Sequence, residues 1–159
     1  MRSFKPILLV EDDTVDAMTV KRALNDLHVT NTLVRVTNGE QALEHLQDSA
    51  NAKPCVILLD LNMPKMNGVE FLKIIKADNR LKCIPVVVLT TSKADQDRCE
   101  CFNSSAAGYI VKPVDYKGFV EAIRILDLYW TLSELPDCDF EEKDVELLSA
   151  SDKRDCQVL

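Results

Sequence analysis

The sequence predicts an α/β fold in which a parallel five-stranded sheet is covered by helices on both faces. Short apolar runs, typical of strands buried on both sides, alternate along the chain with longer stretches of helical periodicity. We expect strands near residues 6–10, 32–37, 55–60, 84–90 and 107–111, and helices near 14–27, 39–48, 67–78, 93–104 and 115–132. Five successive β/α units indicate a doubly wound (βα)5 three-layer sandwich of the flavodoxin-like type, with strand order 2-1-3-4-5.

Polar residues that can cap helix N-termini support the first four helices. The candidates are Asp13 or Thr14 for the first helix, Asn38 before Gly39-Glu40 for the second, Asn67 for the third, and Ser92 with Asp95 for the fourth. In the third helix, Val69, Leu72 and Ile75 recur at the spacing of a core-facing stripe. We expect Lys73 and Lys76 of the same helix to face outward.

The fifth helix carries more apolar surface than packing on one face of a sheet requires. Its core stripe at positions i, i+4, i+7 and i+11 consists of Phe119, Ile123, Leu126 and Trp130. Further apolar side chains extend the surface around the helix, namely Ile125, Leu128, Tyr129 and Leu132. Packing on the sheet explains the stripe, whereas the extension leaves both additional packing and a partner surface open.

Length and charge divide the chain of 159 residues into one domain and a tail. Hydrophobic residues make up 47% of the chain, which is enough for a packed core over residues 1–133. Residues 134–159 contain 9 acidic and 3 basic side chains, and we expect this acidic tail to be mobile or loosely docked. Because the chain has no basic stripe, direct nucleic-acid binding lacks electrostatic support.

The sequence also predicts the cellular location of the protein and the redox state of its cysteines. The N-terminus lacks a long apolar leader and no run is long enough to span a membrane, so we expect a cytoplasmic protein without a membrane partner. Its six cysteines should then be reduced. Cys99 and Cys101 lie two residues apart on a predicted helix, where side chains diverge, so they do not predict a metal site.

Functional side chains follow the predicted strands at the points where these strands end. Glu11 and Asp12 follow the first strand, Asp60 the third, Thr90 the fourth and Lys112 the fifth. In an open parallel sheet these ends line one crevice at the switch point of the strand order. Three carboxylates in one crevice repel each other unless a cation lies among them, and oxygen ligands favour Mg²⁺. We therefore expect a magnesium site there.

With such a cation in place, Asp60 can act as a nucleophile and form an acyl phosphate. The Lys112 ammonium can neutralise one phosphoryl oxygen, and the Thr90 hydroxyl can donate a hydrogen bond to another. The backbone carbonyl of Asn62 can complete the metal shell, while its side chain can influence hydrolysis of the acyl phosphate. Asp13, the last of three consecutive acids, is interpreted as a helix cap.

The pattern over about residues 4–132 resembles the response-regulator receiver domain of two-component signalling. The motifs that carry the resemblance are residues 7–13 (Ile-Leu-Leu-Val-Glu-Asp-Asp), 59–64 (Leu-Asp-Leu-Asn-Met-Pro) with Asn67-Gly68, 84–92 (Ile-Pro-Val-Val-Val-Leu-Thr-Thr-Ser) and 108–113 (Gly-Tyr-Ile-Val-Lys-Pro). The resemblance implies that Asp60 is the phosphoacceptor, and that Glu11, Asp12, Asp60 and the Asn62 carbonyl bind Mg²⁺. It also implies a switch pair, Thr90 and Tyr109, a phosphate-sensing Lys112, and a cis peptide bond between Lys112 and Pro113.

Within this family the chain resembles the stand-alone regulators of phytochrome-type histidine kinases, and related stand-alone regulators of other sensor kinases, including archaeal ones, are an open alternative. That similarity implies a single-domain response regulator, phosphorylated by a sensor histidine kinase, that switches a protein-interaction surface and forms a homodimer through the side of helix 4, strand 5 and helix 5. It implies slow autodephosphorylation but no turnover of a separate substrate. Two alternatives remain: a docking module that acts without phosphorylation, and an aspartyl-phosphate hydrolase. Hydrolases of that kind usually need an acid two residues past the nucleophile, where this chain has Asn62.

Overall fold

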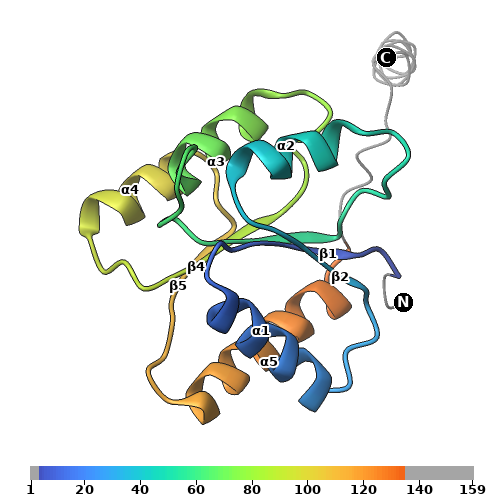
Figure 1. Cartoon of the computed structure of the whole chain (residues 1–159), viewed down its shortest axis with the longest axis vertical. Coiled ribbons are helices and arrows are strands. Elements are labelled where there is room, and N and C mark those ends of the chain that lie inside the picture. The colour runs from blue at the N-terminus through green and yellow to red at the C-terminus, as the bar shows by residue number, and fades with distance from the viewer. Residues whose placement is uncertain (1–3, 135–159) are drawn as a thin grey trace, which may run out of the picture.

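The computed structural model describes residues 4–134, and within them five parallel strands form one sheet (Figure 1). The strands are β1 (Ile7–Val10), β2 (Leu33–Val36), β3 (Val56–Leu59), β4 (Val86–Thr90) and β5 (Gly108–Val111), and the helices are α1 (Thr14–Asp26), α2 (Gly39–Gln47), α3 (Gly68–Ala77), α4 (Asp95–Asn103) and α5 (Tyr116–Leu132). The strand order is β2-β1-β3-β4-β5, so the predicted fold and topology are confirmed. The predicted acidic tail lies outside the described residues.

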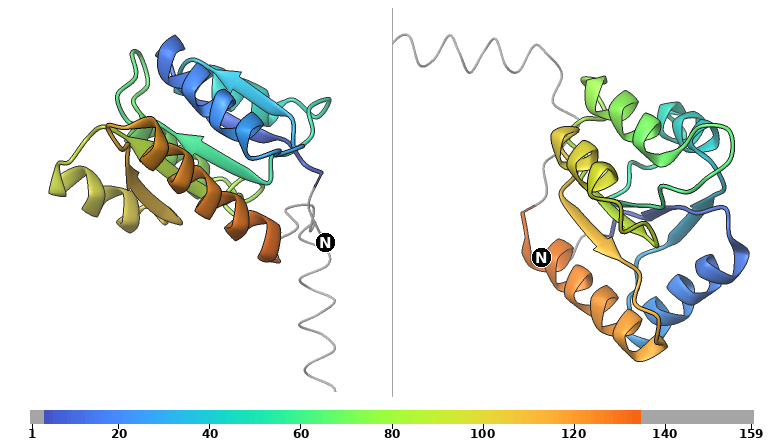
Figure 2. Two further views of the ribbon diagram at one scale, coloured as in Figure 1. Left: turned by 90° about the horizontal axis from the view of Figure 1, so that it is seen from below. Right: turned by 90° about the vertical axis from the view of Figure 1, so that its left-hand side faces the viewer.

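Helices cover both faces of the sheet. Helices α1 and α5 pack together on one face, while α2, α3 and α4 lie on the other (Figures 1 and 2). The side chains of β1 and β3 are buried on both faces and divide alternately between two apolar cores. Leu8, Ile57 and Leu59 belong to the core under α2 and α3, whereas Ile7 and Leu58 belong to the core under α1 and α5. This double burial fixes the direction and register of the two central strands.

Three of the four predicted caps form. Asp13, Asn38 and Asn67 each accept a hydrogen bond from the backbone N–H three residues later. The fourth helix begins at Asp95 as expected, but Ser92 does not cap it, because the N-cap of α4 is Ala94, which makes no side-chain capping bond. The Ser92 hydroxyl donates to the Asp97 carboxylate in the first turn of α4 at 2.6 Å, and its oxygen accepts from the Ala94 amide at 3.3 Å.

Helix α3 buries Leu72 and Ile75 as its pattern predicts, but only one of its two lysines faces outward as expected. Lys73 is exposed, whereas Lys76 is half-buried. The Lys76 ammonium donates to the carbonyls of Lys82 and Ile84 at 2.8 and 2.7 Å, and burial lowers its pKa. Lys76 therefore ties α3 to the segment that leads into β4.

The apolar stripe of α5 is buried as predicted: Phe119, Ile123, Leu126 and Trp130 all pack in the core beneath α1 and α5. The additional apolar side chains remain at the surface, namely Ile125, Leu128, Tyr129 and Leu132. Within residues 4–134 each of these side chains is at least 43% exposed. Packing within the described residues therefore leaves this part of the α5 surface exposed.

No helix among residues 4–134 is long and apolar enough to cross a membrane. Cys99 is exposed and Cys101 is buried, so their side chains diverge as expected and do not form a metal site together. The expectation that all cysteines are reduced was wrong for Cys83, which is disulfide-bonded, while the other cysteines of the described part are free. Cys138 and Cys156 lie outside the described residues.

Gly68 is required where α3 begins against the loop that follows β3. A Cβ atom at this position would lie 2.5 Å from the Asp60 carbonyl oxygen and 2.7 Å from the Leu61 Cα, both of which are backbone atoms. At Gly108 an added Cβ would meet the Val87 side chain at 3.6 Å, an ordinary contact. The two glycines therefore make a matched pair for testing how tightly this loop is packed.

We expect Gly68→Ala to lower the free energy of unfolding by about 1–3 kcal/mol, because the backbone must shift to admit the methyl group. Gly108→Ala should change it by less than about 1 kcal/mol, since its neighbours leave room and alanine has a smaller entropic cost in a strand. Urea denaturation followed by circular dichroism measures both. Equal stability of the two variants would show that the loop after β3 adapts freely.

Candidate functional site

Three carboxylates gather at the carboxyl ends of β1 and β3 because these strands are neighbours. Val10 pairs with Leu59 in the parallel register, and the Asp60 amide donates to the Val10 carbonyl at 3.0 Å. This pairing brings together Glu11 and Asp12, which follow β1, and Asp60, which follows β3. One carboxylate oxygen from each lies within 4.8 Å of the other two. The predicted proximity of these acids is confirmed.

The three acids differ in their exposure to solvent. Glu11 is 1% exposed and Asp60 is 7% exposed, whereas Asp12 is open to solvent. Burial raises the pKa of Glu11 to about 7, although the hydrogen bond from Lys112 acts in the opposite direction. Asp60 adds to the rise through like-charge repulsion. The site therefore holds a buried carboxyl group whose ionised form needs more positive charge than Lys112 alone provides.

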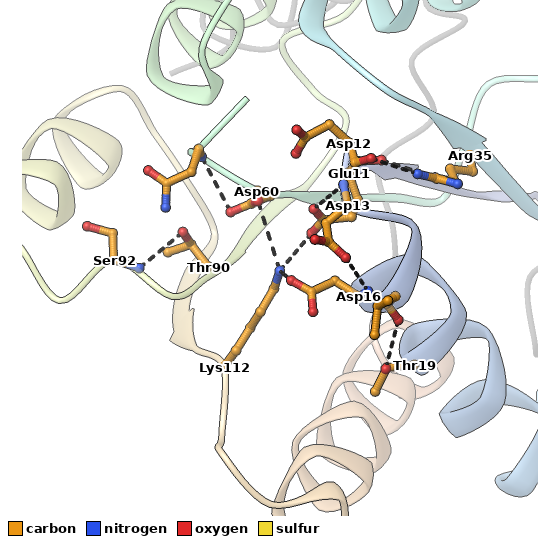
Figure 3. A network of polar contacts seen from close by, with 12 residues as sticks. Glu11, Asp12, Asp13, Asp16, Thr19, Arg35, Asp60, Thr90, Ser92 and Lys112 are labelled. Carbon is orange, nitrogen blue, oxygen red and sulfur yellow. Dashed lines mark hydrogen bonds and ion pairs between the residues drawn. The ribbon is translucent and has the colours of Figure 1, made fainter. Parts of the chain in front are cut away.

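Lys112 follows β5 and extends its ammonium among these carboxylates (Figure 3). The Nζ atom lies 2.7 Å from Glu11 Oε2 and 2.8 Å from Asp16 Oδ2, and 4.0 Å from Asp60 Oδ2. Burial by itself lowers the pKa of Lys112, but the hydrogen bonds to Asp16 and Glu11 outweigh it and raise that pKa. Lys112 is thus charged and bound to two carboxylates, neither of which is Asp60.

Two residues that contact the site, Asp16 and Arg35, were missed in the sequence. Asp16 lies in the first turn of α1 and binds Lys112, which is 96 positions away in sequence. Arg35 lies on β2 and donates to the backbone carbonyls of Glu11 and Asp12 at 3.1 and 3.0 Å, which holds the acid-bearing loop in place. The position of Asp16 three residues after the Asp13 cap was a signal that its side chain lies at the strand-end edge of the fold.

The predicted switch residues meet at Ser92 rather than at Asp60. Thr90 is fully buried at the end of β4, and its hydroxyl oxygen accepts a hydrogen bond from the Ser92 amide at 3.3 Å. The Tyr109 hydroxyl donates to the Ser92 carbonyl at 3.0 Å. The side chain of Tyr109 is half-buried against the core beneath α2 and α3. The segment between β4 and α4 is therefore bound by both residues.

Three further sequence predictions concern Asn62, Asp13 and the peptide bond before Pro113. The Asn62 amide donates to Asp60 Oδ1 at 3.4 Å, while the role of the Asn62 carbonyl as a metal ligand stays a prediction. Asp13 caps α1, as interpreted. The expected cis bond before Pro113 was wrong, since the described residues contain no cis peptide bond. The trans isomer is intrinsically favoured before proline, and in this conformation the Lys112 side chain already reaches Glu11 and Asp16.

The donor set fits a hard divalent cation. Carboxylate oxygens within reach of one another are the ligands that Mg²⁺ and similar ions prefer, and the exposed Asp12 leaves one side open to water or to a phosphoryl oxygen. The raised pKa of Glu11 has the same implication, because a cation would stabilise the ionised carboxylate that burial disfavours. Glu11, Asp12 and Asp60 would therefore hold a divalent metal.

Comparison with known proteins agrees with this geometry. The family profile of the response regulator receiver domain matches residues 7–124. The chain belongs to the response-regulator receiver family. It is 36% identical over 127 residues to the probable methanogenesis regulatory protein FilR2 of Methanothrix harundinacea, covering 78% of this chain and 82% of FilR2. It is 35% identical over 130 residues to the response regulator Rcp1 of Synechocystis sp., covering 79% of this chain and 88% of Rcp1.

Solved receiver structures superpose closely on this fold. A phosphorylated cyanobacterial phytochrome response regulator, RcpA, matches with a TM-score of 0.79 at 36% identity, over 85% of this chain and 100% of RcpA. The Mn²⁺-bound form of Rcp1 matches with a TM-score of 0.78 at 34% identity, over 84% of this chain and 99% of Rcp1. The solved homologues thus include a phosphorylated phytochrome response regulator and a response regulator bound to Mn²⁺.

Charge removal within the carboxylate cluster should weaken metal binding. We expect Glu11→Gln and Asp12→Asn each to reduce the affinity for Mg²⁺ by about tenfold or more, because each removes one of three anionic ligands. Asp13→Asn is the matched control, since it removes the same charge from the adjacent position while asparagine still caps α1. Isothermal titration calorimetry with Mg²⁺ measures all three, and an equal loss in Asp13→Asn would mean that general charge, not the cluster, binds the ion.

Proposed function

We propose that this receiver domain accepts a phosphoryl group on Asp60 from the phosphohistidine of a sensor histidine kinase. The observation that carries the proposal is the place of Asp60, which is buried at the carboxyl edge of the sheet between two further carboxylates and the Lys112 ammonium. We assign Glu11, Asp12, Asp60 and the Asn62 carbonyl to Mg²⁺. The likeness to a phosphorylated regulator and to a Mn²⁺-bound one supports this assignment.

In the proposed reaction a carboxylate oxygen of Asp60 attacks the phosphorus atom and forms an acyl phosphate. The bond between phosphorus and the histidine nitrogen breaks, and the imidazole keeps the electron pair and gains a proton. Bound Mg²⁺ supplies neutralisation of phosphoryl charge. Lys112 neutralises a further oxygen, and the Thr90 hydroxyl donates a hydrogen bond to the group. Asn62 stands where a hydrolase would carry an acid, so we infer no turnover of a separate substrate.

In this proposal the phosphorylation signal is transmitted from Asp60 to the protein surface through Ser92. When the Thr90 hydroxyl turns toward a phosphoryl oxygen, it gives up its bond with the Ser92 amide, and the segment before α4 is freed to move. Tyr109, which donates to the Ser92 carbonyl, follows that segment. The change reaches the surface formed by α4, β5 and α5, because α4 and β5 are in contact. A charge event at one site thereby biases a two-state element.

We assign the receiver domain to residues 1–133 and the acidic segment to 134–159, in a cytoplasmic protein that signals through protein contact. The kinase partner is inferred to be of the phytochrome type, on the strength of the likeness to RcpA. We further infer a homodimer through the side of α4, β5 and α5. It is supported by the exposed apolar side chains of α5, of which Ile125 is 56% exposed and Leu132 is 79% exposed. A second copy would cover surface that the fold itself leaves open.

Beryllofluoride with Mg²⁺ tests phosphoryl acceptance directly, because it mimics the acyl phosphate. We expect the wild-type protein to bind it and Asp60→Asn to lose binding, since the amide cannot bond to beryllium. Asp13→Asn should bind it to within about threefold of wild type. Fluorine NMR measures bound beryllofluoride in each variant. Binding that persists in Asp60→Asn would contradict the proposal, and a failure of the wild type to bind would favour a docking module that acts without phosphorylation.

Sedimentation velocity tests the dimer across a range of protein concentrations. We expect Ile125→Glu to weaken dimerisation by at least about tenfold, because it places a charge in an apolar interface. Met18→Glu, which alters an apolar side chain on α1 that is 64% exposed, is the matched control and should dimerise like wild type. Equal effects of the two substitutions, or a wild-type protein that remains monomeric with and without beryllofluoride, would refute an interface on α5.

A further inference from the structure

We propose that Asp16 is a positioning residue for Lys112, which it holds on the α1 side of the site and withholds from Asp60 until a phosphoryl group competes for the ammonium. This inference rests on the proposed phosphorylation of Asp60. It assigns to α1 a part in setting how readily the phosphorylated state forms. Glu11, Asp12 and Asp60 would bind the cation, whereas the Asp16 carboxylate binds the Lys112 ammonium.

The hydrogen bonds of Lys112 show that it is held away from Asp60. An ammonium has three N–H donors, and two of them are directed to Glu11 at 2.7 Å and Asp16 at 2.8 Å. Asp60 Oδ2, at 4.0 Å, is beyond hydrogen-bond distance. In Figure 3 the Asp16 side chain reaches from the start of α1 toward the end of Lys112, while Asp60 lies on the opposite side of the ammonium. Lys112 must therefore move to bind an oxygen on Asp60.

The backbone of α1 fixes the position of Asp16. The Asp16 N–H donates to the Asp13 side chain at 2.9 Å, so the capping bond that starts the helix also anchors the residue that holds the lysine. The Asp16 side chain is 40% exposed, compared with 8% for Lys112. Asp16 is not one of the three clustered carboxylates, and it is therefore free to bind Lys112 when the cluster is occupied by a cation.

These positions set up a competition for one ammonium. Glu11 belongs to the cluster that a cation would engage, which leaves Asp16 as the Lys112 partner outside it. A phosphoryl group on Asp60 competes with Asp16 for the position of the ammonium, since the bond to Asp16 draws Lys112 toward α1, and the Asp16 carboxylate also repels the added negative charge. Both effects act in the same direction. Removing the charge of Asp16 should therefore favour the phosphorylated state.

Asp16→Asn tests this inference, because asparagine keeps the size of the side chain and removes its charge. At saturating Mg²⁺ we expect this variant to bind beryllofluoride about two- to fivefold more tightly than wild type, a modest gain because Asp16 is partly exposed. Asp13→Asn is the matched control and should show a smaller change. Asp16→Glu should return the affinity toward the wild-type value. In a Lys112→Met background the gain from Asp16→Asn should fall to that of Asp13→Asn, because the competition requires the ammonium.

A crystal structure of Asp16→Asn without beryllofluoride tests the same inference independently of phosphorylation. We expect Lys112 Nζ to move from 4.0 Å to within hydrogen-bond distance of Asp60. Unchanged or weaker beryllofluoride binding in Asp16→Asn, an equal gain in the Lys112→Met background, or an ammonium that stays in place would each overturn the role of Asp16. Failure of the wild type to bind beryllofluoride would instead overturn the proposed function, and the crystal structure would still decide whether Asp16 positions the lysine.

Discussion

The site depends on the crowding of negative charge at one edge of the sheet. Parallel pairing of β1 with β3 places Glu11, Asp12 and Asp60 within 4.8 Å of one another, and burial makes the ionised form of Glu11 costly. The Lys112 ammonium relieves part of this cost through its bond to Glu11. The part of this cost that Lys112 does not relieve favours the binding of a cation at the cluster. A bound cation would in turn stabilise the negative charge of a phosphoryl group.

The rest of the fold maintains this crowding. Burial of β1 and β3 on both faces fixes the register that brings the acids together, and Arg35 binds the carbonyls of the loop that carries two of them. Close packing of Gly68 holds the loop after Asp60 against α3. In contrast, Thr90 and Tyr109 hold the segment before α4 through single hydrogen bonds to Ser92. The acidic pocket is thus held by several contacts, whereas the segment before α4 is held at Ser92 by a single hydrogen bond with each of these residues.

Local patterns in the sequence predicted most of this structure because they encode it directly. Continuous apolar runs between helical stretches indicated the strands. The ends of these strands then indicated where Glu11, Asp12, Asp60 and Lys112 would lie. Asp16 and Arg35 were missed because their contacts join residues 96 and 23 or 24 positions apart, which no local pattern records. The same reason explains Lys76, whose neighbours are carbonyls of the loop beyond α3. Ser92 was misassigned because α4 begins three residues after it, with Ala94 at the N-cap position, and local residue types do not fix that boundary.

The ionisation of Glu11 is the most direct measure of the crowding. A titration that follows the Glu11 side-chain carboxyl carbon by NMR would report its pKa with and without Mg²⁺. The account predicts a pKa of about 7 in the metal-free protein, raised by burial, and a shift to lower values when Mg²⁺ is added, because the cation stabilises the carboxylate. A pKa in the ordinary range of glutamate, or one that Mg²⁺ leaves unchanged, would contradict it.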